Sequence, residues 1–522
     1  MRRQLCIFLL TAAVAPGLWA QEAIDADIVA KIKEEGLNNS QYMDTLFYLT
    51  DVYGPRLANT PMYNRAGEWA VERLKSYGLE NARMEPWGEV GDGWTLTGFQ
   101  LEMIEPSYAP LIGYPGARTA GTNGVIEAVP ILFVPSAGET MEELAAQYTG
   151  KLQGAIILSQ AASLSRRSDI FEAAASRNTD ERLVAMADAA PPTAGGRGRG
   201  RGGARGARSG ARGGARGGGR GGRGGRGGRG GGARFNANQF FADEGVGAVL
   251  RIGAGGDGTL FVSGGSTAVP QVSVIAEHYN RLVRLAEHGI ASKVRVRVDV
   301  DIDESDPMDY NIIAEIPGTD LAHEVVMVGG HFDSWHSATG ATDNASGSAC
   351  AIEAVRILQA IGVKPRRTIR VALWGYEEGG LRGSNAYVQQ TFGTVEEPTP
   401  AHENFSGYFN IDNGTGRIRG VYLQGNANVG PVFQAWLDSL GFPEAKTVTI
   451  NNTGGTDHQS FDRRGLPGFQ FIQDTIHYNS RTHHSNMDDY DHILPEDMIQ
   501  AATIEAAFIY QAAMRDEKLP RK

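Results

Sequence analysis

The stretch RTIRVALWGYEEGG, residues 367–380, joins an apolar run to two adjacent carboxylates. Residues 367–375 have the length and apolar content of a buried strand. Neighbouring side chains of a regular strand point to opposite faces, so Glu377 and Glu378 can serve one site only in an irregular turn. The two glycines that follow permit such a turn. A Glu pair alone is more often solvated surface, but a buried strand leading into it favours a polar site at the strand's end.

Further apolar runs of strand length accompany this stretch, with helical patterns between them. The runs cover residues 311–316, 324–331, 407–412 and 468–474, and the helical patterns cover 345–360 and 429–440. This alternation predicts an α/β domain whose sheet is covered by helices on both faces. Residues 63–77 have apolar positions at helical spacing, and we expect that helix to pack on the same sheet.

Residues 111–293 show a different pattern, which predicts a small β-rich domain inserted between residues 21–110 and 294–522. Its short apolar runs cover residues 129–134, 154–158, 245–252 and 269–275, and a helix-like run follows at 277–288. A loop rich in Arg and Gly, residues 194–235, interrupts the domain. This loop has almost no apolar residues to bury, so we expect it to be disordered.

The N-terminus has the features of a signal peptide, residues 1–20. Two arginines precede an apolar run, and Ala20 offers a cleavage point before Gln21. Leu18 fits the small-residue preference poorly, which leaves an uncleaved anchor open. No other run approaches the ~18 apolar residues of a membrane span. We therefore expect a secreted or periplasmic protein without a transmembrane span. Cys6 would leave with the signal peptide, so the mature chain would keep Cys350 alone and could form no internal disulfide.

The net charge of -11 conceals an asymmetry. Residues 191–242 contain 12 Arg and neither Lys nor acid, so the rest of the chain has 37 basic against 60 acidic residues. This strongly acidic body argues against nucleic acid as a specific partner. Binding of RNA or another polyanion through the Arg/Gly loop is an alternative. Export and the lack of Phe and Tyr between residues 195 and 233 favour a solvated loop instead.

Polar residues cluster where the predicted strands end, which is where open α/β sheets place their sites. His331 ends one strand, and Asp333 follows closely enough to bond the other ring nitrogen. Asp343 precedes a small-residue run that opens a helix, and alone it reads as a helix N-cap. Asp412 closes another strand, where aspartate is commonly a turn former.

A polar loop near the C-terminus supplies His483 and His484. Taken together, two histidines and three carboxylates suit zinc, which takes imidazole nitrogen and carboxylate oxygen in catalytic sites. Five ligands suffice for two metals if one carboxylate bridges them. Metals in such pairs lie about 3.5 to 4 Å apart.

The order of these motifs resembles the zinc exopeptidase family that includes bacterial aminopeptidases, glutamate carboxypeptidases and the carboxypeptidase Q branch, which is the most similar. The matching motifs are VYGPRLANT, GGHFDSW, KPRRTIRVALWGYEEGG, GGTDHQSF and HHSNMD, and they span nearly the whole mature chain. The resemblance implies a mixed, mostly parallel sheet. It also implies that residues 111–293 form a protease-associated domain, which shapes the substrate pocket in relatives.

The resemblance implies a role for each site residue and a cofactor of two Zn²⁺ ions. His331 and Glu378 would each hold one ion with help from Asp412 and His484, and Asp343 would bridge both. Glu377 would be the general base, removing a proton from a water shared by the metals. Asp333 would be the second catalytic residue. The pattern of His, Ser and a later acid, Asp488, selects His484 over His483 as the ligand. The remaining candidates for oxyanion or substrate contacts, none of them assigned, are His483, Asp457 and Thr453.

These inferences predict an exported dizinc exopeptidase that hydrolyses dipeptides or terminal residues of short peptides. The sequence does not decide between amino- and carboxy-terminal recognition, and it leaves a homodimer open. Two alternatives share the fold, namely a non-catalytic, receptor-like binding protein and a one-zinc glutaminyl cyclase. Retention of all five ligands and the free Glu377 argues against both.

Overall fold

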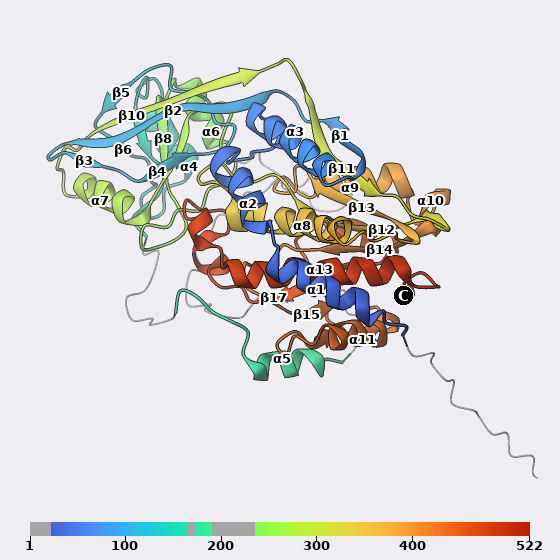
Figure 1. Cartoon of the computed structure of the whole chain (residues 1–522). Helices are drawn as coiled ribbons and strands as arrows, with labels where there is room; N and C mark the ends of the chain where they lie inside the picture. The colour runs from blue at the N-terminus through green and yellow to red at the C-terminus, as the bar shows by residue number, and fades with distance from the viewer. Residues whose placement is uncertain (1–21, 164–172, 191–234) are drawn as a thin grey trace, which may run out of the picture.

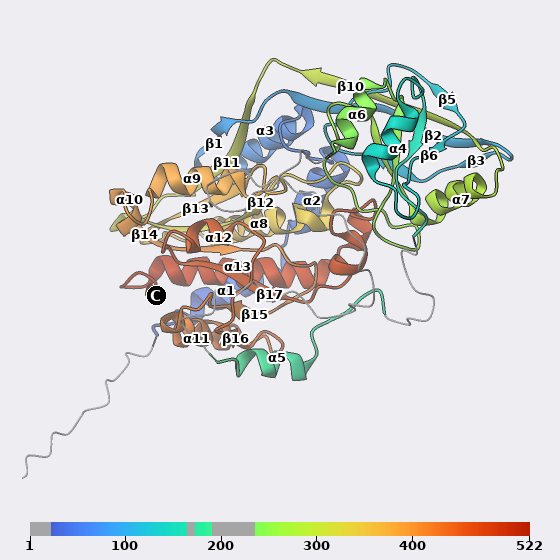
Figure 2. The same cartoon turned by 180° about the vertical axis from the view of Figure 1, so that it is seen from behind.

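The computed structural model describes residues 22–163, 173–190 and 235–522. The predicted signal peptide 1–20 and residues 194–234 of the Arg/Gly-rich loop lie outside these ranges. The described chain forms a large α/β body with a smaller β-rich lobe beside it (Figures 1 and 2). Among the helices of these ranges, none combines the length and the apolar content needed to cross a membrane.

The body is built on an eight-stranded mixed sheet. In spatial order its strands are β1 (Glu80–Glu89), β11 (Met308–Ile316), β13 (Arg367–Trp374), β12 (Leu321–His331), β14 (Phe405–Asn410), β17 (Gly468–Gln473), β15 (Ile418–Tyr422) and β16 (Thr447–Thr449). The four central strands from β13 to β17 run parallel. Antiparallel pairing adds β11 and β1 at one side and β15 at the other. The predicted α/β class with a mixed, mostly parallel sheet is confirmed.

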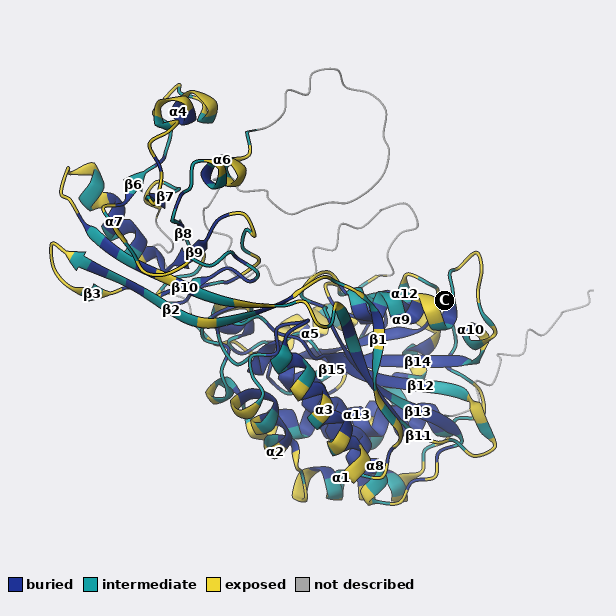
Figure 3. Cartoon of the chain, turned by 90° about the horizontal axis from the view of Figure 1, so that it is seen from above, coloured by how far each residue is buried: buried dark blue, intermediate teal, exposed yellow. Residues whose placement is uncertain are grey.

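Helices cover both faces of this sheet. Strand β12 places Val326 and Val328 in the core of one face and Met327 in the core of the other, and all three are fully buried. Figure 3 shows much of the neighbouring strands β13 and β14 in the dark blue of buried residues. The first face is covered by α1 (Ala26–Asn38), α2 (Tyr42–Phe47), α3 (Pro61–Ser76), α8 (Ser346–Ala360), α11 (Gly430–Leu440) and α13 (Pro495–Met514). The second is covered by α9 (Arg382–Phe392), α10 (Pro400–Asn404) and α12 (His458–Asp462). Double-sided burial explains the near-continuous apolar runs of the strands.

The lobe contains two smaller sheets. One has the order β3 (Ala109–Pro110), β2 (Gly93–Glu105), β10 (Lys293–Asp303), β5 (Ile126–Ala128), and the other β4 (Gly113–Pro115), β9 (Gln271–Val274), β8 (Ala248–Ile252), β7 (Ile156–Leu158), β6 (Ile131–Leu132). Its helices are α4 (Met141–Tyr148), α6 (Ala237–Asp243) and α7 (Ala276–Glu287). The long strands β2 and β10 pair antiparallel and link the lobe to the body (Figure 1). Strands β6 to β9 and helix α7 confirm the elements expected there, whereas the division into domains at 110 and 294 stays a prediction.

One part of the inserted region packs on the body instead of the lobe. Segment 173–190 carries α5 (Asp180–Ala187), which packs on β16 and lies near α11 (Figure 2). Figure 1 shows α5 on the side of the body away from the lobe. Arg419 of β15 donates a hydrogen bond to the carbonyl of Asn178 (3.2 Å). The inserted region therefore touches the body at two separated places.

Short helical turns complete the described chain. They are η1 (Tyr48–Val52), η2 (Ala341–Ala345), η3 (Ala427–Val429), η4 (Tyr478–Thr482) and η5 (Tyr490–His492). Two of them, η2 and η4, carry polar residues at the carboxyl ends of the central strands.

Candidate metal centre

The central parallel strands end in the polar residues that the sequence singled out. His331 is the last residue of β12, Glu377 and Glu378 follow β13, and Asp412 follows β14. Position 329, two residues before His331, needs glycine, because a Cβ there would lie 1.9 Å from the carbonyl oxygen of Ala372 on the neighbouring strand. The carboxyl edge of the sheet thus gathers these side chains, as expected for this class of fold.

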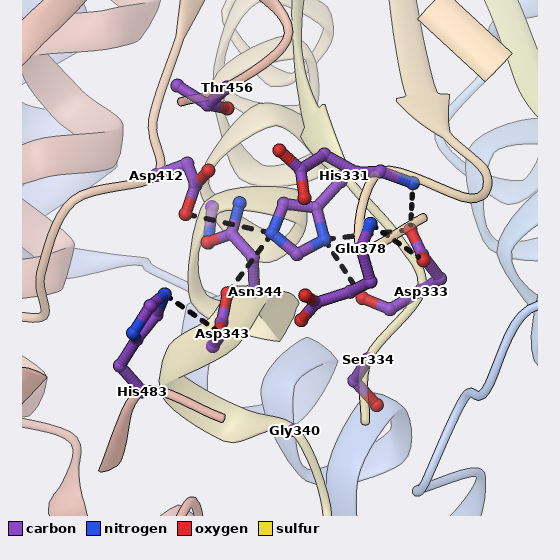
Figure 4. Close-up of polar contacts among 12 residues, drawn as sticks. His331, Asp333, Ser334, Gly340, Asp343, Asn344, Glu378, Asp412, Thr456 and His483 are labelled. Atoms are coloured by element: carbon purple, nitrogen blue, oxygen red, sulfur yellow. Dashed lines mark hydrogen bonds and ion pairs between the residues drawn. The ribbon is translucent and has the colours of Figure 1, made fainter. Parts of the chain in front are cut away.

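Five side chains converge, with the carboxylate of Asp343 between the other four, and Figure 4 labels Asp343, His331, Asp412 and Glu378. The Nε2 atom of His331 lies 3.2 Å from Oδ1 of Asp343 and 3.6 Å from Oδ1 of Asp412. The Nε2 atom of His484 lies 3.4 Å from Oδ2 of Asp343 and 2.9 Å from Oε2 of Glu378. Asp343 therefore presents one oxygen to each of two pairs of side chains.

The chemistry of this cluster fits bound cations. Within the described ranges, Oδ2 of Asp343 and Oε1 of Glu378 are buried without a hydrogen-bond partner. Burial and the charge of Asp343 raise the pKa of Glu378 well above its usual value. Buried polar atoms normally have partners, and crowded carboxylates need a positive charge nearby. Imidazole nitrogens with carboxylate oxygens form a donor set that suits zinc.

Two overlapping ligand groups can be defined by distance. The ligand atoms of His331, Asp343 and Asp412 lie within 4.8 Å of one another, and so do those of Asp343, His483 and His484. The His483 ring stacks on that of His484 with centroids 3.8 Å apart, and its side chain is 38% exposed. Either His483 or the more deeply buried Glu378 could therefore complete the metal position formed by Asp343 and His484.

The backbone around Asp343 is held by hydrogen bonds from two sides. Buried Asp488 accepts the amide N–H groups of Thr342 and Asp343, the latter at 3.2 Å. The side chain of Asn344 donates to the carbonyl of Ile411, just before Asp412 (2.8 Å). Burial, followed by the charge of Asp343, raises the pKa of Asp488 to about 8. Helix α8 shows no side-chain cap, so Asp343 is not the helix N-cap that its position alone suggests.

Asp333 lies beside the second ring nitrogen of His331, as expected, with both its carbonyl and its carboxylate. Its Nδ1 lies 2.9 Å from the backbone carbonyl oxygen of Asp333, whereas the nearer carboxylate oxygen of Asp333 is 3.6 Å away. That carboxylate instead accepts the amide N–H groups of Glu377 (2.9 Å) and Glu378 (3.3 Å). The carbonyl makes the shorter contact and the carboxylate beside it fixes the turn that carries the glutamates, so an orienting role for the Asp333 carboxylate stays a prediction. The carbonyl supplies the orienting bond that ligand histidines require.

Glu377 has the environment of a base. Its residue is 9% exposed. Burial raises the pKa of Glu377 well above its usual value, His331 opposes that effect, and Asp412 adds to it. A carboxylate with a raised pKa is a stronger proton acceptor near neutral pH.

Sequence reasoning missed Tyr478, which lies in η4. Its hydroxyl is 3.1 Å from Oδ1 of Asp343 and 3.1 Å from Oδ1 of Asp412, and its ring is buried. Tyrosine supplies one O–H donor, so it can hold one of these two carboxylates at a time. Tyr478 lies six positions before His484, and no spacing or motif in the sequence indicates that a residue at that position reaches the metal centre.

Sequence reasoning also left Arg56 of VYGPRLANT without a role. Its guanidinium is fully buried and donates to the carbonyl groups of Phe332, Thr339 and Gly340 at 2.8 to 3.0 Å, and to that of Leu49. Arg56 thereby fixes the segment between His331 and Asp343. The motif itself was the available signal.

The remaining candidates lie nearby but have no decided role. Asp457 precedes α12 and is fully buried, and burial raises its pKa to about 7. The backbone of Thr453 bonds Gln424 and His458. Roles for His483, Asp457 and Thr453 at an oxyanion or a substrate stay predictions.

Residues 311–509 match the sequence model of peptidase family M28. These residues, here called the M28 segment, are similar to that family. The M28 segment contains all five converging residues and Glu377. The M28 segment also includes Tyr478.

The wider comparisons agree with this family. The chain is 29% identical to carboxypeptidase Q of Homo sapiens over 257 residues, which are 49% of this chain and 52% of that protein. It is 33% identical to leupeptin-inactivating enzyme 1 of Streptomyces exfoliatus over 159 residues, 30% of this chain and 34% of that protein. The chain thus spans about half or less of the length of these curated relatives.

Solved structures share the fold of the M28 segment and the lobe. A peptidase M28 precursor from Shewanella amazonensis superposes with a TM-score of 0.63 and 22% identity, covering 95% of this chain and 98% of that chain. A zinc aminopeptidase from Bacillus subtilis gives a TM-score of 0.54 and 17% identity, covering 92% and 96%. These likenesses establish the architecture.

Proposed function

We propose that this chain is an exported metallo-exopeptidase that holds two zinc ions. One observation carries the proposal: the two carboxylate oxygens of Asp343 face different partners. His331 and Asp412 lie on one side, and His484 and Glu378 on the other. A bridging carboxylate with two such sets is the arrangement expected of a two-metal hydrolase. The N-terminal apolar run supports export.

Zinc ions in such a site lower the pKa of a water molecule and polarise the substrate carbonyl. In our proposal Glu377 takes the proton from the attacking water and later gives it to the leaving amine. Its backbone position is fixed by the bond from its N–H to Asp333. The Tyr478 hydroxyl donates to the carboxylate of either Asp343 or Asp412 and helps to hold it in place. Proton transfer by a positioned carboxylate contributes about 10² to 10⁴ in rate.

The proposed substrates are dipeptides or terminal residues of short peptides. Carboxypeptidase Q and zinc aminopeptidases, by their names, act at opposite ends of a peptide, and both are among the relatives. We further propose that the lobe is the counterpart of a protease-associated domain. Assays with N-blocked and C-blocked peptides would show which terminus of the peptide must be free.

The test uses the full-length chain, a panel of unblocked dipeptides, and N-blocked and C-blocked peptides. We expect hydrolysis of unblocked dipeptides, loss of activity with a chelator and recovery with added Zn²⁺. A chain that binds no metal and hydrolyses none of the panel would support the receptor-like alternative and overturn the proposal. Cyclisation of an N-terminal glutamine without hydrolysis would overturn it in favour of a cyclase.

A further inference from the structure

The loop of residues 474–488 carries both Tyr478 and His484 and has an unusual backbone. Ile476 (φ 49°) and His484 (φ 55°) both adopt the left-handed conformation. This conformation is unfavourable for residues other than glycine, especially for a β-branched residue such as isoleucine. Such residues persist when surrounding structure holds them in place. The hydrogen bonds at Ile476 and His484 therefore indicate which parts of the chain hold the loop in this conformation.

The lobe holds the loop at His484. The N–H of Val262 donates to the carbonyl of His484 (2.8 Å), and the N–H of Asn486 donates to the carbonyl of Leu260 (3.1 Å). The side chain of Asn486 adds two bonds, accepting from the N–H of Leu260 (2.7 Å) and donating to the carbonyl of Gly258 (3.3 Å). A short antiparallel bridge thus joins the lobe to the loop.

The lobe side of this bridge is well packed. Leu260 and Val262 are at most 2% exposed and form one cluster with Ile275, next to the start of α7. Tyr114 of β4 packs against the same cluster. The Val262 N–H that binds the His484 carbonyl therefore belongs to a buried part of the lobe and not to a free loop tip.

A second part of the inserted region holds the loop at Ile476. Ser176 and Ile476 exchange two backbone hydrogen bonds, at 2.9 and 3.1 Å. The hydroxyl of Ser480 donates to the carbonyl of Ala174. Asn178 anchors the segment, since its N–H donates to the Asp474 carboxylate at 2.8 Å. Both left-handed residues of the loop are thus bonded to the inserted region.

We infer that the inserted region positions the metal centre through two of its described parts, residues 174–178 and 258–262. Its two contacts hold Ile476 and His484 in left-handed conformations, and they thereby place the Tyr478 hydroxyl and the His484 imidazole against Asp343. This role goes beyond covering a substrate, and it rests on the proposed function because it takes His484 as a metal ligand. Loosening the contact at Asn486 should weaken the zinc position of His484 and spare that of His331.

The test is a Zn²⁺ titration of the metal-free full-length chain against a competing chelator, with Asn486→Ala as the variant. We expect one of the two zinc dissociation constants to rise about tenfold or more, the usual effect of losing a partner of a ligand. The other constant should stay unchanged. Asn486→Asp keeps the acceptor for Leu260 and should lose less. Asn428→Ala, which removes a side-chain bond to the carbonyl of Arg521, is the matched control and should change neither constant.

Hydrogen exchange supplies a readout that does not depend on metal. Amides between residues 476 and 486 should exchange faster in metal-free Asn486→Ala than in the metal-free wild type. Unchanged zinc constants in the variant, or an equal loss of both, would overturn the positioning role while leaving the two-zinc proposal intact. A wild-type chain that takes up no zinc would overturn both.

Discussion

Replacing Arg56 by alanine tests whether the segment between His331 and Asp343 shapes the metal centre. The guanidinium donates to four carbonyl groups, three of which lie in residues 332–340. Burial lowers the pKa of Arg56 to about 10, so the side chain remains protonated at neutral pH. The substitution removes a buried cation and the donors of all four hydrogen bonds.

The magnitude follows from the carbonyl groups that lose their donor. A buried acceptor left without a partner costs about 1 to 3 kcal/mol. Four such acceptors, each at the lower limit of that range, give a loss of about 4 kcal/mol in the free energy of unfolding. The lower limit applies because water can enter the space and bind some of the carbonyl groups. Arg56→Lys keeps the charge with fewer and differently placed donors, and we expect about half of that loss.

The assay combines thermal unfolding with zinc titration of the metal-free chain. Arg56→Ala should lower Tm and also weaken zinc binding, because His331 and Asp343 flank the released segment. Arg367→Ala is the matched control, since Arg367 is equally buried and bonds the carbonyls of Arg515 and Asp516 at the far end of β13. It should lower Tm and leave zinc binding intact. Equal effects of both variants on zinc, or an Arg56→Ala chain as stable as wild type, would refute the reasoning.

The other predictions concern single side chains. Glu377→Gln should keep both zinc ions and lose activity by about 10² to 10⁴; near-normal turnover in steady-state assays would remove it as the base. Glu378→Gln should lose one zinc by metal analysis whereas His483→Ala keeps both, and the reverse result would exchange their roles. Tyr478→Phe should weaken zinc binding about tenfold in chelator titrations; a lower kcat with unchanged affinity would instead make it an oxyanion donor. Burial raises the pKa of Glu505 well above its usual value, so the folded state holds a proton that the unfolded state releases, and stability should fall as pH rises above about 4.3. Glu505→Gln should flatten the fall of Tm between pH 5 and 8, and an unchanged slope would contradict this.

Much of the body could be predicted because its strands are buried on both faces. Runs such as residues 324–331 and 367–375 are apolar throughout, and they end in residues that a buried strand does not tolerate. Four of the five ligand candidates were found for the same reason, since His331, Glu378 and Asp412 end or follow strands and Asp343 precedes a helix at the edge where parallel sheets place their sites. His484 lies in a polar loop, and the family resemblance selected it.

Other features depend on contacts between segments far apart in the sequence. Strand β2 has mixed polarity, and its pairing with β10 across the whole inserted region leaves no local signal. Tyr478 reaches the centre through a loop whose backbone is bent at Ile476 and His484, and isoleucine in a left-handed conformation contradicts its local preference. The Asp333 carboxylate had two feasible partners, and the sequence does not show how close it lies to either.

Zinc content of aspartate variants tests the central claim most directly. Metal analysis of the full-length chain should find two zinc ions in the wild type, one in Asp412→Asn and none retained in Asp343→Asn, because Asp343 alone faces both positions. An Asp343→Asn chain that keeps a zinc ion as tightly as Asp412→Asn does would contradict a shared carboxylate, and with it the two-metal site.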